Sequence, residues 1–326
     1  MSADTAKVET DDDGIRLDRW FKRHYPALGH GRLEKLLRTG QVRLDGKRAK
    51  AADRVAAGQN VRIPPQVASA PPKEPERVPV PSKLKLEDLV LHLDRSVIVL
   101  NKPAGLATQG GSGIGSHNVD AMLDQLAFER KQRPRLVHRL DRDTSGVLVI
   151  ARTPSAAAAL AKSLAQRDAS KVYWALTRGV PKQKRGTIRA ALAKEGGRGA
   201  ERMEVSESDG AKHAVTDYAV LDHAGEEFAW VAAKPVTGRT HQIRVHLASL
   251  GTPIVGDFKY GGTAARGKGA IADKLHLHAR SIDIAHPDGG RLKAVAPLPS
   301  HMQKSWEFLG FNPGSEIDPF QGRRKR

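Results

Sequence analysis

The sequence predicts an α+β protein of two domains, in which a small α/β domain precedes a larger one whose mostly antiparallel or mixed sheet is flanked by helices. Three observations lead to this prediction. A chain of 326 residues with 39% apolar residues is long enough for about two packed domains. Seven of the nineteen prolines fall between positions 64 and 81, where they favour an extended spacer. Beyond the spacer, strand-like and helix-like runs are mixed along the chain. The expected parts are a small domain at 14–64, a spacer at 65–83, a large domain at 84–311 and a basic tail at 312–326.

Two short helices and a hairpin account for the small domain. Leu17, Trp20 and Phe21 recur at helical spacing, and so do Leu33, Leu36 and Leu37. The run V-R-L-D-G-K at 42–47 places Asp-Gly between short strand-like segments, which is typical of a tight hairpin. A further strand at 61–63 closes the domain.

The small domain is strongly basic. Residues 14–63 carry thirteen Lys and Arg against four Asp and Glu. Arg32, Lys35 and Arg38 are spaced to share one face of the second helix. The order of these features resembles an S4 RNA-binding domain, and the resemblance implies that this basic face contacts RNA phosphates.

The large domain reads as a sheet with interspersed helices. Strands are expected at 89–93, 97–100, 147–151, 171–177, 214–221, 227–236 and 275–285, and helices at 117–129 and 154–167. The glycine-rich run at 261–270 is expected to be a flexible basic loop, and Arg323–Arg326 a disordered electrostatic arm.

Charge and composition limit the possible functions. The net charge of +18 favours a polyanionic partner, and nucleic acid is the natural candidate. The absence of cysteine excludes disulfides, thiolate catalysis and cysteine-based zinc sites. The N-terminal region lacks an apolar core for a signal peptide, and no run approaches the length needed to span a bilayer. We therefore expect a cytoplasmic protein, monomeric and without a membrane partner.

The run R-L-V-H-R-L-D-R-D-T-S-G at 135–146 is the most informative segment of the chain. It places two aspartates, a histidine and several arginines between apolar Leu136-Val137 and an apolar strand. A carboxylate at the edge of a core costs free energy unless a cation lies near it. Asp141 lies close to Arg139 and Arg142 in the sequence, so cationic partners are at hand.

This run resembles the H-R-L-D-x-x-T-S-G segment of RluA-type pseudouridine synthases. Three further segments resemble motifs of that family in the same order: N-K-P-A-G at 101–105, K-V-Y at 171–173 and G-R-T-H-Q-I-R at 238–244. The glycine-rich stretch after Gln109 is similar to that of the ribosomal large-subunit synthase C branch. The resemblance implies an isomerase that converts uridine to pseudouridine in RNA, most naturally in 23S ribosomal RNA. Transfer RNA and messenger RNA stay open as substrates.

The resemblance also assigns roles to residues. Asp141 is the expected catalytic carboxylate, which attacks C1′, adds to C6 or takes the C2′ proton; the sequence does not choose among these. Arg244 is the expected partner that keeps this carboxylate charged. Tyr173 is expected to stack on uracil and to help move the C5 proton. The reaction imports no group and oxidises nothing, so neither a cofactor nor a metal is expected.

The remaining positions concern RNA binding. Arg139 is expected to fill the space left when the target base flips out of its stack. Arg239 is expected to contact phosphate. Lys102 is expected to support the pocket rim or to contact the RNA backbone, and His138 to orient the loop.

Other functions fit less well. A metal-dependent hydrolase would use His241 with His246, or His276 with His278, but no H-E-x-x-H motif is present. A dinucleotide-binding enzyme would use the glycines at 111–115, but the preceding strand ends too early. A non-enzymatic RNA chaperone is the serious alternative, and it predicts that Asp141 is dispensable.

Overall fold

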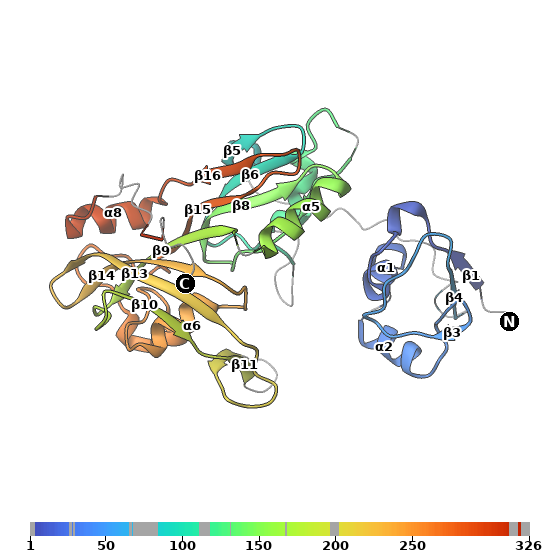
Figure 1. The fold of residues 1–326 in the computed structure, drawn as a ribbon, viewed down its shortest axis with the longest axis horizontal. Coiled ribbons are helices and arrows are strands. Elements are labelled where there is room, and N and C mark those ends of the chain that lie inside the picture. The colour runs from blue at the N-terminus through green and yellow to red at the C-terminus, as the bar shows by residue number, and fades with distance from the viewer. Residues whose placement is uncertain are drawn as a thin grey trace. The chain divides into compact units, whose positions relative to one another are not determined.

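The chain folds into two compact units, Met1–Pro79 and Val80–Arg326, each with its own core (Figure 1). The computed structural model describes residues 4–25, 28, 30–64, 67, 84–110, 118–130, 132–166, 168–195, 202–312 and 319–320. The expected spacer at 65–83 lies outside these residues except for Val67, which packs into the core of the small unit. Within the described ranges, no helix has both the length and the apolar character that crossing a membrane would require.

The small unit contains the expected pair of helices and the hairpin. Its elements are β1 (Asp4–Lys7), η1 (Thr10–Asp12), α1 (Leu17–His24), α2 (His30–Arg38), β2 (Arg43–Leu44), β3 (Lys47–Arg48) and β4 (Asn60–Ile63). The strands form an antiparallel sheet in the order β1-β4-β2-β3. Asp45 and Gly46 both have positive φ, 47° and 76°, as the expected tight hairpin turn requires.

The predicted start of the small domain at residue 14 is wrong. Strand β1 pairs with β4 along its whole length, and Val8 is almost fully buried in the core. The segment D-T-A-K of β1 lacks the alternation of apolar and polar residues that predicts a strand. It adopts the strand conformation because it pairs with β4 at the edge of the sheet.

The large unit is built on one mixed sheet. Its strands run in the order β10-β13-β14-β9-β15-β8-β6-β5, with β16 paired to β15 and β7 to β8. These strands are β5 (Val90–Leu93), β6 (Val97–Lys102), β7 (Arg135–Leu136), β8 (Ser145–Ala151), β9 (Ser170–Arg178), β10 (Arg185–Arg189), β13 (Val215–Ala224), β14 (Phe228–Pro235), β15 (Leu277–Ala285) and β16 (Arg291–Val295). A separate hairpin joins β11 (Leu192–Glu195) to β12 (Arg202–Val205). The sheet is mostly antiparallel, as predicted, and β15 pairs with β8 in parallel.

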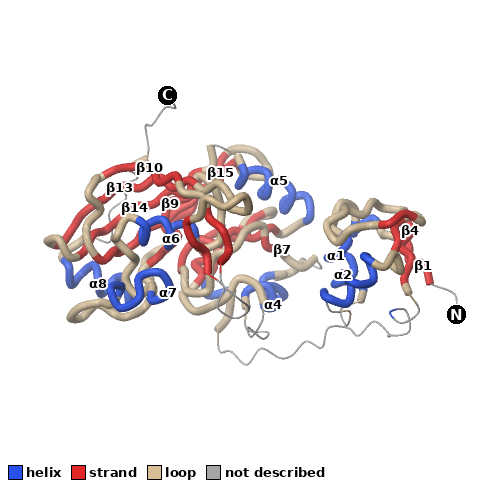
Figure 2. Tube along the Cα trace, turned by 90° about the horizontal axis from the view of Figure 1, so that it is seen from below, coloured by secondary structure: helices blue, strands red, loops and turns tan. Residues whose placement is uncertain are grey.

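Helices lie around the strands of the large unit (Figure 2). They are η2 (Glu87–Leu89), α4 (Val119–Met122), η3 (Leu123–Leu126), α5 (Pro154–Ala165), α6 (Gln242–Ser249), α7 (Phe258–Gly261), η4 (Gly262–Ala265) and α8 (Ser300–Leu309). In place of the single helix expected at 117–129, the described residues form two short helical elements, α4 and η3. The flexible loop expected at 261–270 is wrong at its start, because η4 occupies 262–265 and Ala265 is fully buried.

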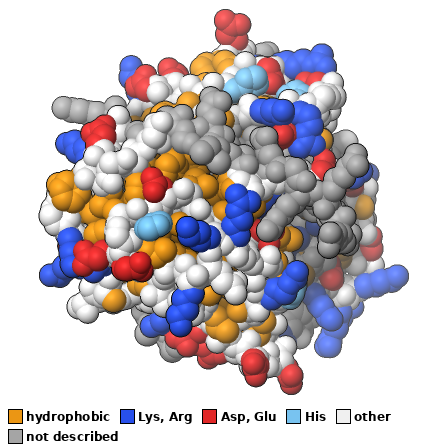
Figure 3. Space-filling model, turned by 60° about the vertical axis from the view of Figure 1, so that its left-hand side comes forward, with side chains coloured by type: hydrophobic (Ala, Val, Ile, Leu, Met, Phe, Trp, Pro, Cys, Tyr) orange, Lys and Arg blue, Asp and Glu red, His pale blue; other side chains and the backbone are white. Residues whose placement is uncertain are grey.

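Part of the expected C-terminal tail packs on the large unit. Phe320 is buried against the tryptophan-rich core cluster, and the Pro319 carbonyl accepts a hydrogen bond from Arg185. These two residues are therefore not part of a disordered arm; Arg323–Arg326 lie outside the described residues. On the face drawn in Figure 3, Lys and Arg side chains are dispersed among hydrophobic ones.

A close approach of β8 and β15 lies next to the Asp141 loop. Gly146 has φ +108°, and a Cβ added there would lie 2.2 Å from the Ala279 carbonyl oxygen. Only glycine fits this position. The parallel pairing of β8 with β15 therefore depends on the last residue of the H-R-L-D-x-x-T-S-G segment.

Candidate active site

The loop that carries Asp141 connects β7 to β8 and is tied to a neighbouring loop. The Thr108 hydroxyl donates to the Leu140 carbonyl (2.8 Å) and accepts from the Leu140 amide (3.1 Å). The Gly105 amide donates to the Arg142 carbonyl (2.9 Å). Asp141 therefore stands between two anchored residues, with its side chain 19% exposed.

Lys102 anchors the same loop from inside the protein. It is fully buried, and its Nζ donates to the carbonyls of Pro103 (2.9 Å), Leu106 (2.7 Å) and Arg142 (3.0 Å). Burial lowers the pKa of Lys102 to about 7, against the charges of Asp143 and Asp141, which raise it. The expected contact between Lys102 and RNA is therefore wrong, because the amine is enclosed by protein carbonyls. Its position agrees with the other expected role, support of the pocket rim.

His138 orients the start of the loop, as expected. Its Nε2 accepts a hydrogen bond from the Val149 amide (2.8 Å), which places the ring proton on Nδ1. Burial, with a smaller effect of Lys171, lowers the pKa of His138 to about 4, so the ring is neutral. The neighbouring Arg139 is exposed.

Helix α6 brings Arg244 to Asp141. The Arg244 Nη1 lies 3.9 Å from the Asp141 Oδ2, so the structure does bring together two residues separated by about a hundred positions. The principal partner of Arg244, however, is Asp257, whose two oxygens accept from Nε and Nη2 at 2.8 and 2.7 Å. Burial opposes the charge of Arg244, but the hydrogen bonds and charge of Asp257, followed by the charge of Asp141, raise its pKa above the usual value.

Asp257 and Tyr260 are residues of the site that the sequence did not reveal. Asp257 is 1% exposed and caps α7 by accepting from the Tyr260 amide. The Tyr260 ring lies under the Arg244 guanidinium, 5.0 Å from ring centre to Cζ. The signal was present in G-D-F-K-Y at 256–260, because an acid next to a glycine after an apolar run is typical of a helix cap.

His241 also faces the carboxylate. Its Nε2 lies 3.8 Å from the Asp141 Oδ2, and its Nδ1 lies 2.6 Å from the Tyr260 hydroxyl. The residue has left-handed backbone, φ 54°, at the start of α6, which turns the ring toward the loop. Burial lowers the pKa of His241 and the charge of Asp141 raises it, with a net lowering that keeps the ring neutral at neutral pH.

Tyr173 lies on β9, which pairs with both β14 and β15 near the centre of the sheet. Burial and then the charge of Asp141 raise the pKa of Tyr173 well above its usual value. Its hydroxyl is therefore a proton donor, not a phenolate, at neutral pH.

A pocket of about 260 Å³ lies beside the Asp141 loop. The pocket contains all three predicted catalytic residues and two of the predicted RNA-binding residues: Asp141, Tyr173, Arg244, Arg139 and Arg239. Arg239 is exposed at its edge, where Nε donates to the His213 carbonyl (3.1 Å). A pocket of this volume suits a single nucleoside, and both Asp141 and Tyr173 line it.

The predicted basic face of the small unit is exposed. Arg32, Lys35 and Arg38 all lie on the solvent side of α2. Lys35 and Arg38 border a groove of about 620 Å³ whose other wall includes Arg48 and Lys50. This groove is a basic surface with one acidic residue, Glu34, at its border.

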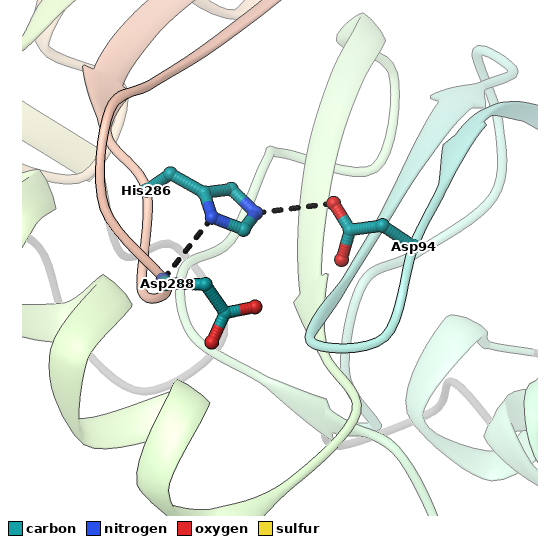
Figure 4. A group of neighbouring side chains, drawn as sticks. All are labelled: Asp94, His286 and Asp288. Carbon is teal, nitrogen blue, oxygen red and sulfur yellow. Dashed lines mark hydrogen bonds and ion pairs between the residues drawn. The ribbon is translucent and has the colours of Figure 1, made fainter.

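One group of side chains in the described ranges has metal-like spacing, Asp94 with His286 and Asp288 (Figure 4). Its atoms already bond to protein. Asp94 accepts from His286 Nε2 (3.0 Å), while His286 Nδ1 accepts from the Asp288 amide (3.1 Å). Asp288 also accepts from Arg95 Nε (2.9 Å). We interpret the group as a hydrogen-bonded clamp between the β5–β6 turn and the β15–β16 turn.

Comparison with known proteins identifies the family of the chain. A family model described as RNA pseudouridylate synthase matches residues 96–249. RNA pseudouridine synthase 4, mitochondrial, of Arabidopsis thaliana is 34% identical over 94% of this chain and 82% of its own length. Among solved structures, human RNA Pseudouridylate Synthase Domain Containing 4 has a TM-score of 0.58 and 30% identity, over 69% of this chain and 94% of that one.

The chain belongs to the RluA-type family of RNA pseudouridine synthases and is therefore an isomerase of uridine in RNA. Within the family it is similar to ribosomal large subunit pseudouridine synthase C. The protein of that name from Rickettsia felis is 35% identical over 87% of this chain and 93% of its own length.

Proposed function

We propose that this enzyme converts uridine to pseudouridine in large-subunit ribosomal RNA, and that Asp141 is the carboxylate that begins the reaction. The observation that carries the proposal is the position of Asp141 in a nucleoside-sized pocket, within 4 Å of both Arg244 and His241. The ribosomal substrate is supported by the names of the relatives, several of which are called ribosomal large subunit pseudouridine synthase C.

The chemistry requires one charged carboxylate. The bond from C1′ to N1 breaks, the free uracil turns, and a bond from C1′ to C5 forms. Asp141 begins this by attack on C1′, by addition to C6 or by removal of the C2′ proton. The Arg244 guanidinium places a positive charge 3.9 Å from the Asp141 carboxylate, and Asp257 holds Arg244 in that position by two hydrogen bonds. Arg244 therefore acts without forming a direct hydrogen bond that would occupy the reacting oxygens.

Tyr173 and Arg139 act on the substrate. The ring of Tyr173 forms a flat wall for uracil, and its protonated hydroxyl can donate to the base or return a proton to it. The target nucleotide must first leave its stack, which costs about a few kcal/mol. The exposed guanidinium of Arg139, at the pocket entrance, offsets part of that cost by filling the vacated space and contacting phosphates.

The S4-like unit supplies affinity through phosphate contacts, which carry little sequence information. Replacing Arg32, Lys35 and Arg38 together by Gln should weaken RNA binding and flatten its dependence on salt, since fewer counterions are released. The rate of the bound complex should change little. If RNA binding by the triple variant depends on salt as steeply as that of the wild type, the basic face does not contact RNA phosphates.

Mapping of pseudouridine in ribosomal RNA tests the whole proposal. RNA from cells that carry the wild-type gene is compared with RNA from cells that carry Asp141→Ala or no gene. We expect one or more positions of large-subunit RNA to lose pseudouridine in both of the latter. If positions in transfer RNA lose pseudouridine instead, the substrate is transfer RNA. If every position keeps its pseudouridine in cells with Asp141→Ala, a non-enzymatic RNA chaperone is favoured.

A further inference from the structure

A second hollow adjoins the active-site pocket and is not used by the reaction described above. It has a volume of about 370 Å³ and shares three walls with the pocket, namely Asp141, His241 and Arg244. The remaining walls come from the Asp141 loop, from the turn that begins α7 and from Leu275, just before β15. An RNA strand that delivers a nucleotide into the pocket continues on both sides of that nucleotide, and this hollow adjoins the pocket.

The lining of the hollow includes an exposed aromatic residue, Phe258. Phe258 is 44% exposed although it is a large apolar side chain. Single exposed apolar residues are ordinary on protein surfaces, so exposure alone decides nothing. The position of Phe258 is the evidence that it has a function, because it directly follows Asp257, the residue that holds Arg244 beside the proposed catalytic carboxylate.

The charges around Phe258 suit a nucleotide. Lys259 and Arg142 both line the hollow, and the Arg142 side chain is 66% exposed. Its Nε donates to the Gly105 carbonyl (3.2 Å), which leaves the rest of the guanidinium for other contacts. Asp143 also lines the hollow, 4.0 Å from Arg142. Asp141 and Asp257 line it as well, so the hollow offers carboxylates that can accept hydrogen bonds from a base edge beside cations that can bind a phosphate.

We propose that this hollow binds the nucleotide next to the target uridine, with its base stacked on Phe258 and its phosphate near Lys259 and Arg142. The inference rests on the proposed function and adds a specific subsite to it. Aromatic side chains recognise unstacked bases of single-stranded RNA by this kind of stacking. Asp257 connects the subsite to the chemistry, since it caps the turn that presents Phe258 and also positions Arg244.

The test uses a synthetic RNA that contains a mapped target uridine. Two further RNAs carry an abasic nucleotide on its 5′ or its 3′ side. With the intact RNA, Phe258→Ala should lower kcat/KM by about 5- to 150-fold, the usual range for loss of one base–aromatic stack. With one of the two abasic RNAs, wild type and Phe258→Ala should be equal within about twofold. Phe258→Trp should restore activity on the intact RNA.

Phe308→Ala is the matched control, because Phe308 is 56% exposed on α8 and does not line the hollow. It should behave as wild type with all three RNAs. The subsite is overturned if Phe258→Ala equals wild type on the intact RNA. It is also overturned if the loss is the same on the intact RNA and on both abasic RNAs, which would indicate a structural defect. A wild-type enzyme that releases no C5 tritium would instead refute the proposed function itself.

Discussion

The replacement Asp257→Asn tests how Arg244 is held beside Asp141. It removes a charge that is 1% exposed and bonds to Arg244 at 2.7 and 2.8 Å. Breaking a buried pair by removing one partner costs about 3–5 kcal/mol. The Asn oxygen can still accept one bond, and Asp141 lies 3.9 Å from Arg244, so we expect the lower part of that range, about 3 kcal/mol. For a domain of this size the melting temperature should fall by roughly 6–12 °C.

Activity should fall as well. Released from Asp257, the Arg244 guanidinium is expected to move onto the Asp141 carboxylate and occupy the oxygens that must react. We expect kcat for tritium release from C5-labelled RNA to drop by about 10- to 100-fold, a loss of roughly 1.4–2.8 kcal/mol of transition-state stabilisation. KM should change less than kcat, because the amide oxygen that replaces the carboxylate can still accept from the Tyr260 amide and keep the turn that presents Phe258.

Asp283→Asn provides the matched control. Asp283 also accepts from an arginine, Arg291 Nε at 2.6 Å, but its side chain is 36% exposed and lines neither the pocket nor the adjoining hollow. Such exposed pairs contribute about 0.2–1 kcal/mol. If Asp257→Asn loses no more stability and no more activity than Asp283→Asn, the anchoring role of Asp257 is refuted.

Three further predictions concern the fold and the loop. Gly146→Ala should lower the free energy of unfolding by more than about 2 kcal/mol, measured with urea, because its methyl group would collide with the Ala279 carbonyl at a positive φ. Acid should destabilise the large unit: burial lowers the pKa of His276 and His278 to about 4, so each is neutral when folded but takes up a proton near pH 6.5 when unfolded. Their contribution, up to about 3 kcal/mol each, is present above pH 6.5 and lost as pH falls toward 4. Lys102→Met should lower kcat by about tenfold, or roughly 1.4 kcal/mol, without changing the salt slope of RNA binding.

Each of these has a control. Gly225→Ala introduces a methyl group into open space at φ 55°, so it reports the backbone cost alone; equal losses for both glycines would contradict the collision. His278→Gln should flatten the acid dependence of unfolding between pH 6.5 and 4. Superimposable acid profiles would show that His278 is not the titrating group. If RNA binding by Lys102→Met depends less steeply on salt than that of the wild type, Lys102 does contact the RNA backbone.

The candidate catalytic residues could be predicted from the sequence because each lies inside a contiguous motif. Asp141, Tyr173 and Arg244 were predicted from three separate segments, and the structure places all three around one pocket. The mixed sheet was predictable from apolar runs with strand spacing. These inferences use local patterns, and local patterns are what a single sequence displays.

The residues that hold these candidate catalytic groups in place were harder to predict from the sequence. Lys102 was expected either to support the pocket rim or to contact the RNA backbone, and three backbone carbonyls enclose its amine. Which carbonyls point at one amine depends on how two loops meet, and no pattern in the sequence encodes that. The pairing of Arg244 with Asp257 likewise depends on the turn between α6 and α7.

The central claim is that the negative charge of Asp141 begins the reaction. The most direct measurement is single-turnover tritium release from C5-labelled ribosomal RNA by Asp141→Asn, which keeps the shape of the side chain and deletes its charge. We predict no release above background, with RNA affinity and melting temperature close to those of the wild type. Release within tenfold of the wild-type rate would contradict the account.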